Sequence, residues 1–481
     1  MKRTRPWRRR TALLAGTLLL TTGVGAAPGG AAPVVQVWET TGDKSKLLER
    51  QEDEEFGSGG SAETIIDVDP ATTYQTIDGF GAAFTDSSAS LVANTLDQGA
   101  RDELMNDLFG AGGIGLSMVR QPLGASDFAT AESGDYTFDD TCCDLSDFTT
   151  GHDEAYILPI LRQAKQINPD LKVMGTPWSA PAWMKTNDDV DGGELRSENH
   201  GVFADYLVRA AQAYSDAGVP LDFLSIQNEP YHPESGDGSA GYPSMHMSPE
   251  QQAAAIGDEI GPKFAESGLK TQLLAWDHNW SHPEYPGIVV DDPEAGQYVP
   301  GAAFHCYEGD VSGQAEFQQA HPDKDVWLTE CSGGDWSPDF AQNLKWQTQN
   351  LVIGGTRNWA KGVALWNVAL DQNHGPTNGG CSDCRGVVTV NTDDGQVTRN
   401  EEYYVLGHVA KFVKPGAQRI ESTSNPNGIE SVAFRNADGS LALLALNASD
   451  SEQTFQVRSG GQSFEHALPA GAVTTFTWQG A

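Results

Sequence analysis

Basic residues are scarce in this chain. Its 481 residues include 30 Lys and Arg against 66 Asp and Glu, which gives a formal net charge of −36 at pH 7. A field of this sign repels phosphate backbones and anionic lipid surfaces. The composition therefore predicts no nucleic-acid partner. It is compatible with a neutral sugar ligand, although much of the acidity can simply keep the protein soluble.

Long hydrophobic runs are missing beyond the N-terminal segment. That segment has basic residues between positions 2 and 10, an apolar run over 11–24 and small residues at 25–27. The pattern is typical of an export signal, and the run is short for a membrane span. We expect residues 1–32 to be a signal peptide, with a twin-arginine route left open by Arg8 to Arg10. The mature protein is then expected to be secreted, without integral membrane association.

Two common kinds of site lack their motifs, and cysteines are few. No Gly-x-Ser-x-Gly elbow occurs at a strand-to-helix turn, and no glycine-rich loop with a nearby lysine opens a helix. Cys381 and Cys384 are spaced like metal ligands, but a structural zinc site needs two more ligands at chelating spacing. Because export favours disulfides, we expect loop-stapling disulfides, no metal and no cofactor, with the pairing left open. The cysteines are Cys142, Cys143, Cys306, Cys331, Cys381 and Cys384.

Short apolar runs alternate with helix-like segments through most of the chain. The segments 155–167, 201–217 and 251–264 have the spacing of helices that bury one face, and the last follows a capping-box pattern at Ser248 to Gln251. Strands that alternate with helices predict an α/β fold, a parallel (β/α)8 TIM barrel over residues 77–405. The expected strands are 77–83, 117–123, 172–176, 223–227, 272–276, 302–305, 326–329 and 363–366.

The sequence pattern changes after residue 415. Alternating apolar residues are there separated by Asn, Asp and Gly, which is typical of antiparallel strands and turns. The polar stretch 40–62 has the composition of a loop. We expect a linker and strands within 33–76 to join residues 406–481 in a β-sandwich side domain. Its expected strands are 64–68, 428–434, 440–446, 451–457 and 472–478.

Two glutamates each end a buried run: Glu229 follows the run that begins at Phe223, and Glu330 follows the run that begins at Val326. A charged side chain at the end of a buried strand must lie in a solvated opening, and the carboxyl ends of barrel strands share one face. Cleavage of a glycosidic bond needs such a pair, one to protonate the leaving oxygen and one to attack the anomeric carbon or activate water. A single strand-end glutamate is usually only solvated. The pair, with Asn228 beside it, predicts a glycosidase.

Other strand ends carry carboxylate, amide and aromatic side chains, which hold neutral sugars by hydrogen bonds and stacking. Structural roles remain alternatives for Arg120, as a buried ion pair with Asp86 or Glu330, and for Trp366, as part of the core. His305 can orient Glu330 or fill space. The candidates for substrate binding are Asp127, Trp178, Asn228, Tyr307, Trp366, Arg120 and His305.

Longer motifs extend this pattern. They are Gly79 to Asp86, Arg120 to Pro122, Ser126 to Phe128, Asn228-Glu229-Pro230, Leu365 to Leu370, Tyr404 to His408 and Thr176-Pro177-Trp178-Ser179-Ala180-Pro181-Ala182-Trp183-Met184-Lys185-Thr186-Asn187. Through them the chain resembles glycoside hydrolase family 30, most closely its glucosylceramidase branch. The resemblance implies a barrel with a fused β-sandwich, retention at the anomeric carbon, Glu229 as acid/base and Glu330 as nucleophile. It also implies a glucose subsite lined by Asp127, Trp178, Asn228, Tyr307 and Trp366.

The chain departs from the resembled family where specificity is set. Cys306 stands where the family's glucosylceramidases have Trp, and Cys331 follows Glu330 directly. These two cysteines would lie on adjacent strand ends, where a bridge can form. The loop 373–385 lacks the family's sugar-contacting Asn, which leaves the leaving-group preference open.

We therefore expect a secreted retaining β-glycoside hydrolase of the glucosylceramidase or β-glucosidase type that cleaves β-D-glucosyl linkages. Its expected partners are a β-glucoside, glucosylceramide or β-glucan, with Glu229 kept protonated by its neighbours. Endo-β-1,6-glucanase and β-xylosidase activity are alternatives within the family. A non-catalytic carbohydrate-binding protein is the alternative from another class, although binding alone needs no matched carboxyl groups.

Overall fold

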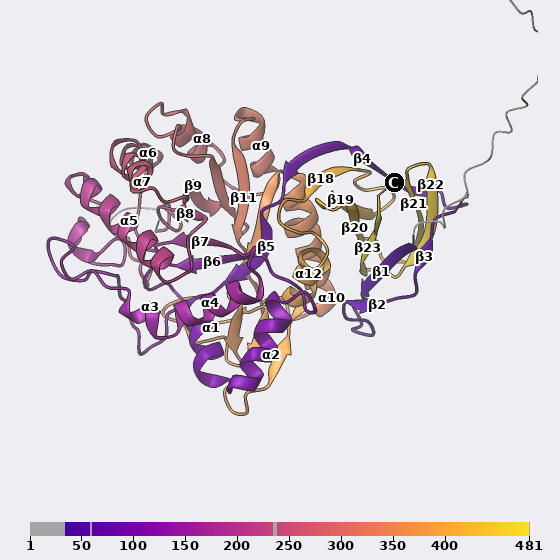
Figure 1. Cartoon of the computed structure of the whole chain (residues 1–481), viewed down its shortest axis with the longest axis horizontal. Helices are drawn as coiled ribbons and strands as arrows, with labels where there is room; N and C mark the ends of the chain where they lie inside the picture. The colour runs from indigo at the N-terminus through magenta and orange to yellow at the C-terminus, as the bar shows by residue number, and fades with distance from the viewer. Residues whose placement is uncertain (1–33, 58–59, 234–237, 481) are drawn as a thin grey trace, which may run out of the picture. The chain divides into compact units, whose positions relative to one another are not determined.

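A closed barrel of eight parallel strands forms the larger part of the molecule, with strands in the order β10-β11-β13-β5-β6-β7-β8-β9 (Figure 1). The structure is a computed structural model that describes residues 34–57, 60–233 and 238–480, so the expected signal peptide lies outside it. The barrel confirms the predicted fold class. Its strands are β5 (Gly79–Ala83), β6 (Met118–Pro122), β7 (Lys172–Thr176), β8 (Phe223–Ser225), β9 (Gln272–Asn279), β10 (Gly301–His305), β11 (Asp325–Glu330) and β13 (Ala360–Leu365).

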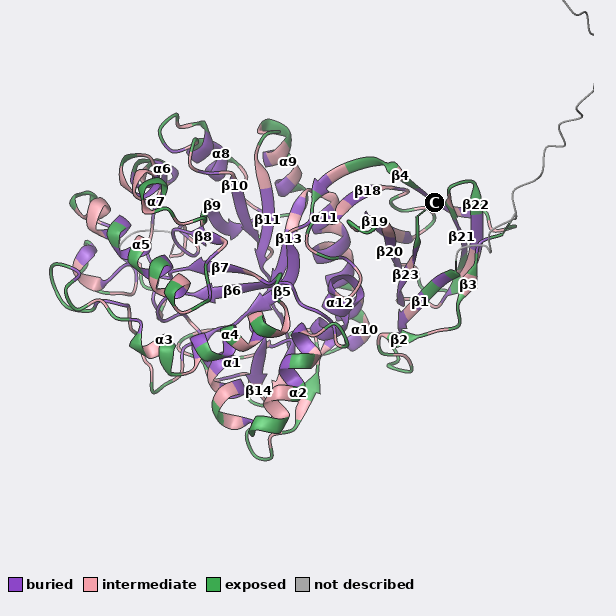
Figure 2. Cartoon of the chain, in the orientation of Figure 1, coloured by how far each residue is buried: buried purple, intermediate pink, exposed green. Residues whose placement is uncertain are grey.

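Each barrel strand lies on one of the apolar runs predicted as strands, and these strands are buried along nearly all of their length (Figure 2). Strand β9 continues past the expected end at Trp276 to Asn279. Its register against β10 shifts between Ala303 and Phe304. The φ angles of Trp276 and Asp277 are 74° and 67°, a left-handed conformation that side chains other than glycine rarely adopt. An irregular strand end thus carries Asp277.

Packed side chains fill the barrel interior. One buried side chain from each of six neighbouring strands contributes to a separate cluster of Met118, Met174, Phe223, Leu274, Ala303 and Trp327. The rings of Phe223 and Trp327 are 5.3 Å apart, and the indole N–H of Trp327 donates to Asp78 at 3.0 Å. The barrel is therefore plugged, and a site can open only at the ends of its strands.

Along the chain the helices alternate with the strands, and in space they pack around the outside of the barrel (Figure 1). Helix α4 buries Ile157, Leu158, Ile160, Leu161 and Ala164 along one face, as its sequence spacing predicts. The helices are α1 (Asp86–Ser90), α2 (Gln98–Phe109), α3 (Gly151–Ala155), α4 (Ile157–Ile167), α5 (His200–Asp216), α6 (Pro249–Ala255), α7 (Gly261–Ser267), α8 (Glu284–Asp291), α9 (Ser312–Ala320), α10 (Phe340–Gln347), α11 (Gly355–Arg357) and α12 (Glu401–Ala410).

The predicted capping box is present at the start of α6. The Ser248 hydroxyl accepts from the Gln251 N–H, and the Gln251 side chain accepts from the Ser248 N–H. The helix expected over 251–264 is divided, because a π-helical turn at Ile256–Ile260 joins α6 to α7.

A ten-stranded sheet built from both ends of the chain forms the side domain, in the order β2-β1-β23-β20-β19-β18-β4-β21-β22, with β3 also pairing with β1. This confirms the predicted sandwich of N- and C-terminal strands. The strands are β1 (Val34–Thr40), β2 (Glu49–Arg50), β3 (Glu54–Glu55), β4 (Thr64–Thr76), β18 (Gln418–Ser422), β19 (Ile429–Arg435), β20 (Ser440–Asn447), β21 (Gln453–Ser459), β22 (Gln462–Leu468) and β23 (Val473–Gln479).

The sequence prediction missed several of these strands. The stretch 40–62 is not only a loop, since β2 and β3 lie within it. Both are two polar residues long, and they are strands only because β1 offers them backbone partners. Strand β4 pairs antiparallel with β18 and parallel with β21, so it joins sheet partners from distant parts of the chain.

Helix α12 contacts the sheet through a buried histidine. His408 shares hydrogen bonds with the hydroxyls of Thr475, at 2.9 Å, and Thr40, at 2.8 Å. Burial lowers the pKa of His408 to about 3, so its ring is neutral between the two strands. The domain boundary expected between residues 405 and 406 falls inside this helix.

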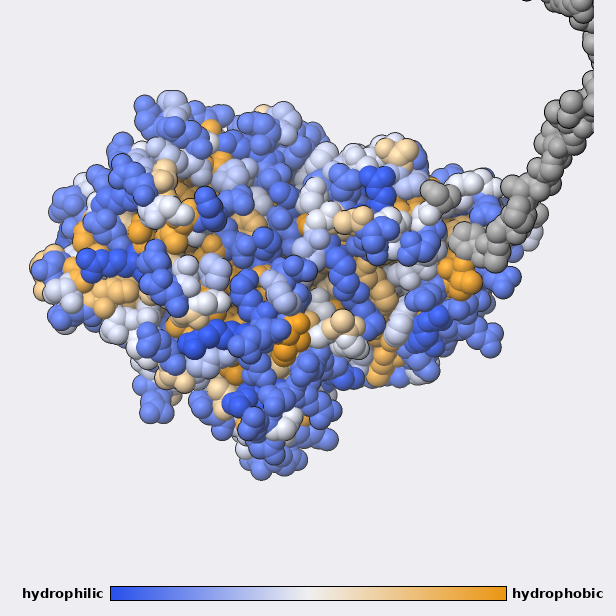
Figure 3. All heavy atoms as spheres, in the orientation of Figure 1, coloured by the Kyte–Doolittle hydropathy of each residue, from blue (hydrophilic) through white to orange (hydrophobic). Residues whose placement is uncertain are grey.

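Hydrophilic residues predominate on the molecular face drawn in Figure 3, where apolar residues form small, scattered patches. None of the helices in the described residues is long and apolar enough to cross a membrane.

Candidate active site

Arg120, fully buried on β6, joins four strand ends. One guanidinium nitrogen donates to Glu330 Oε2 at 2.6 Å, and the other donates to Asn228 Oδ1 at 2.7 Å and to Asp277 Oδ2 at 2.8 Å. Of the two ion pairs predicted for Arg120, the one with Glu330 is present. Asp86 instead accepts hydrogen bonds from other neighbours, including the ring of His152.

Glu330 ends β11, and its side chain is 8% exposed. Its Oε1 accepts a hydrogen bond from the Tyr307 hydroxyl at 2.8 Å, while Oε2 is bound by Arg120. Burial raises the pKa of Glu330, although the charges of His305 and Arg120 act against that rise. Both oxygens are thus fixed by donors that favour the ionised carboxylate, the form that a nucleophile requires.

Glu229 follows β8 in a left-handed backbone conformation, with a φ of 47°. Its N–H donates to the carbonyl of Asp277 at 3.1 Å, which ties the two strand ends together. Such a conformation costs roughly 1–3 kcal/mol in a residue other than glycine, and it is concentrated at functional sites. It places the side chain, 15% exposed, against His305.

His305, at the end of β10, lies between two carboxylates. Its Nδ1 is 3.0 Å from Glu229 Oε1, and its Nε2 is 3.0 Å from Asp277 Oδ1. Burial lowers its pKa, but the charges of Glu330 and of both hydrogen-bonded carboxylates raise it to about 9. At neutral pH His305 is therefore an imidazolium that donates in both directions. It orients Glu229, whereas the sequence had suggested Glu330.

The proton of this pair resides on the histidine. Burial raises the pKa of Glu229, but the charges of His278 and His305 lower it to about 2. Burial also lowers the pKa of His278 to about 4, so that ring is uncharged at neutral pH and acts on Glu229 only in acid. The expectation that neighbours keep Glu229 protonated was wrong for the unliganded protein, because His305 binds the shared proton more tightly.

Two tryptophans form a wall beside Arg120. The rings of Trp178 and Trp366 stack at 5.2 Å with an interplanar angle of 23°. The Arg120 guanidinium lies 4.9 Å from the Trp178 ring and 5.6 Å from the Trp366 ring. Both tryptophans are almost wholly buried, with Phe128 in the same cluster. They belong to the core and, through Arg120, to the site.

Asp127 has a carboxyl oxygen with no protein partner. Among the residues that the structure describes, none hydrogen-bonds to its buried Oδ1. Burial, with the charges of Glu330 and Glu229, raises the pKa of this carboxyl group well above its ordinary value. Its backbone carbonyl accepts from the N–H groups of Asn378 and Gly380, so the loop expected to border the site holds it. An unpaired buried carboxyl is suited to bind a sugar hydroxyl.

Sequence reasoning did not select Asp277 and His278. Asp277 links the two halves of the site, because it accepts from Arg120, His305 and the Thr329 hydroxyl, the last at 2.7 Å. It carried the same signal as the two glutamates, a charged residue directly after an apolar run. Nothing in the sequence distinguishes His278 from an ordinary loop histidine.

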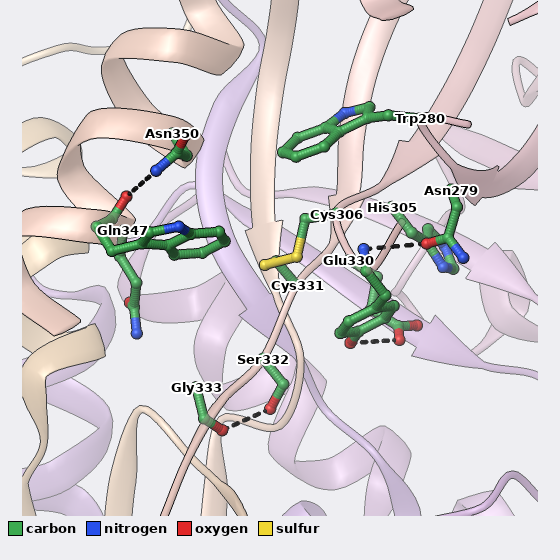
Figure 4. Close-up of a disulfide and its surroundings, with 12 residues drawn as sticks. Asn279, Trp280, His305, Cys306, Glu330, Cys331, Ser332, Gly333, Gln347 and Asn350 are labelled. Atoms are coloured by element: carbon green, nitrogen blue, oxygen red, sulfur yellow. Dashed lines mark hydrogen bonds between the residues drawn. A yellow bond between two sulfur atoms is a disulfide. The ribbon is translucent and has the colours of Figure 1, made fainter. Parts of the chain in front are cut away.

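The bridge between Cys306 and Cys331 is present and joins the ends of β10 and β11 (Figure 4). It lies one residue from Tyr307 and one residue from Glu330, and thus fixes the donor beside the carboxylate. Cys142 pairs with Cys143 and Cys381 with Cys384, so the described residues contain no free cysteine.

A pocket of about 480 Å³ opens beside Glu229 and is also lined by Tyr307, the donor to Glu330. A bound group therefore has room next to the Glu229 carboxylate. Glu229, His278 and His305 each place one potential metal-ligand atom within 4.8 Å of the others. Because both nitrogens of His305 already bind carboxylates, this ring offers no free lone pair to an ion. The lining residues are Glu229, Tyr231, His232, His278, Asn279, Ser281, His282, Tyr307 and Glu308.

Family comparison agrees with this geometry. The profile of the glycosyl hydrolase family 30 TIM-barrel domain matches residues 77–413, and that of the family's β-sandwich domain matches residues 416–476. The chain belongs to glycosyl hydrolase family 30. It is thus a family 30 glycosidase, as the sequence motifs predict.

Relatives of this family 30 glycosidase include two kinds of enzyme. It is 35% identical to an endo-1,6-β-D-glucanase of Aspergillus fumigatus, with 87% of this chain and 88% of the relative covered. It is 27% identical to mouse lysosomal acid glucosylceramidase, over 86% of this chain and 83% of that enzyme. The solved structure of the endo-β1,6-glucanase BT3312 superposes with a TM-score of 0.87 at 33% identity, covering 93% of this chain and 99% of that one.

Removal of Arg120 should destabilise this family 30 glycosidase strongly. In Arg120→Met the carboxylates of Asp277 and Glu330 remain buried without their cation, at a cost of about 3–5 kcal/mol in unfolding free energy. The matched control is Arg399→Met, since that guanidinium is 49% exposed in its pair with Asp107 and should cost at most about 1 kcal/mol. Chemical denaturation measures both. Equal losses would show that the Arg120 network is not a buried charge cluster.

Proposed function

We propose that this protein is an endo-β-1,6-glucanase that cleaves by double displacement with retention at the anomeric carbon. The observation that carries the proposal is the continuous chain of contacts Glu330–Arg120–Asp277–His305–Glu229. It holds one carboxylate with its negative charge fixed by donors and the other next to a stored proton. These are the two roles that a retaining glycosidase needs.

In the first step, a Glu330 oxygen attacks the anomeric carbon and the bond to the leaving oxygen breaks. The proton held by His305 passes through Glu229 to the leaving oxygen, so a neutral alcohol departs. An ester then joins the sugar to Glu330. Tyr307 and Arg120 hold the attacking group in place, which contributes by orientation rather than by proton transfer.

In the second step, water enters from the pocket beside Glu229. The Glu229 carboxylate removes its proton and passes that proton to His305, while the water oxygen attacks the anomeric carbon and releases Glu330. Two inversions restore the original configuration. Asp127, Asn228, Trp178 and Trp366 are proposed to line the position of the reacting glucose.

The glucan substrate is favoured by the relatives named as glucanases, which match at 32–35% identity. Glucosylceramide, the substrate that the sequence motifs favoured, is the second candidate, supported by relatives named as glucosylceramidases at 27–31%. The three disulfides support an exported protein, since such bonds persist in oxidising compartments.

A substrate panel tests this assignment. Purified protein is incubated with β-1,6-glucan, glucosylceramide in detergent, and nitrophenyl β-glucoside and β-xyloside. The proposal predicts that the mean length of β-1,6-glucan falls rapidly, before free glucose accumulates. Release of glucose alone from an otherwise intact polymer, or hydrolysis of glucosylceramide but not glucan, would contradict it.

Replacement of His305, the residue that holds the proton next to Glu229, should narrow the pH range of activity. In the wild type, activity on glucan should fall as pH rises through about 9, where His305 loses its proton. In His305→Gln the fall should begin at lower pH, because Glu229 then has to hold the proton itself. The control is His282→Gln, since His282 lines the same pocket but pairs with Glu284. A basic limb unchanged by His305→Gln would exclude His305 as the proton store.

A further inference from the structure

We propose that a second sugar-binding site, formed by Tyr307, Trp336 and Trp346, extends the catalytic pocket and binds glucose units of the glucan away from the bond being cleaved. The inference rests on the proposed function and specifies how a long substrate is held. It commits to a carbohydrate chain as the occupant.

The exposed aromatic side chains of the described residues all lie at one place. Tyr307 is 44%, Trp336 54% and Trp346 45% exposed, and no other large aromatic side chain in residues 34–57, 60–233 and 238–480 is as open to solvent. All three line one pocket of about 590 Å³. Exposed aromatic surface is unfavourable unless it meets a partner, and its concentration marks a binding site.

This pocket is continuous with the catalytic one. Tyr307 lines both of them, and its hydroxyl donates to the proposed nucleophile Glu330 at 2.8 Å. Cys306 and Ser332 also line the aromatic pocket, so it borders the two strand ends that carry His305 and Glu330 (Figure 4). A polymer leaving the active site can therefore pass over Tyr307 onto the tryptophans.

The ring of Trp336 is held in place before a ligand binds. Trp336 follows strand β12 (Gly333–Gly334), and its ring lies over Gly334, where an added Cβ would be 2.0 Å from the indole. Only glycine leaves that space. Trp346 lies on helix α10, so its backbone is fixed by the helix, and its backbone carbonyl also accepts from the Asn350 side chain at 2.9 Å. Aromatic groups that are already ordered lose little entropy on binding.

The chemistry of the lining fits a sugar better than an acyl chain. A sugar offers a C–H face for aromatic rings and hydroxyls for amides, and this pocket supplies both kinds of group. The polar groups at the pocket belong to Ser332, Ser337, Gln342, Asn343, Lys345, Gln347 and Gln349.

The activity test compares substrates of different length. In Trp336→Ala and Trp346→Ala, kcat/KM for β-1,6-glucan should fall about tenfold relative to kcat/KM for nitrophenyl β-glucoside, as expected for loss of one stacking contact of about 1.4 kcal/mol. The phenylalanine variants should recover most of the loss. Ile288→Ala, which truncates another exposed side chain, should leave both substrates unaffected. Melting temperatures matched to the wild type confirm folding.

A binding test separates this inference from the proposed activity. Calorimetry measures β-1,6-linked gluco-oligosaccharides binding to Glu330→Gln with and without Trp336→Ala. Weaker binding without the tryptophan supports the site even if the wild type hydrolyses no β-1,6-glucan, in which case only the proposed activity fails. Equal affinities would overturn the inference. A loss seen for glucosylceramide but not for glucan would also overturn it and assign the surface to lipid.

Discussion

Replacement of Glu330 by glutamine should reduce kcat on β-1,6-glucan by about 10⁴-fold or more, because the amide cannot form the glycosyl ester. The fold should survive, since glutamate and glutamine side chains have nearly the same shape. The amide oxygen can still accept from Arg120, and the amide NH2 group can donate to the Tyr307 hydroxyl. Initial rates of reducing-end release measure the effect. Thermal unfolding checks the fold.

The matched control is Glu308→Gln, because Glu308 is an exposed carboxylate at the rim of the same pocket. It should keep activity within about twofold of the wild type, the range usual for surface changes. A loss of similar size in both variants would mean that the pocket needs negative charge in general. Retained activity in Glu330→Gln would remove Glu330 from the role of nucleophile.

Replacement of Glu229 by glutamine should reduce kcat on glucan by about 10³-fold, within the range typical of general acid–base catalysis. Its diagnostic feature is a dependence on the leaving group. A sugar alcohol needs the proton that Glu229 delivers, whereas dinitrophenolate leaves without one. Formation of the glycosyl-enzyme from dinitrophenyl β-glucoside should therefore be nearly unaffected.

Pre-steady-state release of dinitrophenol measures this first step directly. His278→Gln is the comparison, because His278 lies 3.7 Å from Glu229 but is uncharged at neutral pH. It should affect glucan turnover far less. Equal losses in Glu229→Gln on the activated and the natural substrate would show that Glu229 acts by position rather than as an acid.

The active site combines conformational strain with fixed charge. Glu229, Asp277 and Asn367 all have positive φ angles, at 47°, 67° and 46°. Glu229 and Asn367 lie a few residues beyond strands β8 and β13, and Asp277 lies near the end of β9, where the backbone turns to present each side chain. The free energy stored there is supplied by the packed barrel below, and it orients the groups before substrate binds.

Sequence reasoning located the barrel because buried parallel strands are short apolar runs whatever their partners. It located both glutamates for the same reason, since a charged residue after such a run is visible without a structure. Strands β2 and β3 were missed because their polar residues are strands only through pairing with β1. That pairing is not encoded in the local pattern.

The electrostatics of the site could not be predicted in the same way. His305 contacts Glu229 rather than Glu330, and holds the proton, because the fold brings the ends of β8, β9 and β10 close together. The exposed tryptophans Trp336 and Trp346 were also invisible as a group. They are ten residues apart in loop and helix, and only the folded chain shows that both border Tyr307.

The most direct test of double displacement is the anomeric configuration of the first reducing sugar released from β-1,6-glucan, followed by proton NMR within minutes of adding enzyme. The account predicts that the β-anomer appears first and that the α-anomer grows only at the rate of mutarotation. Initial accumulation of the α-anomer would contradict it.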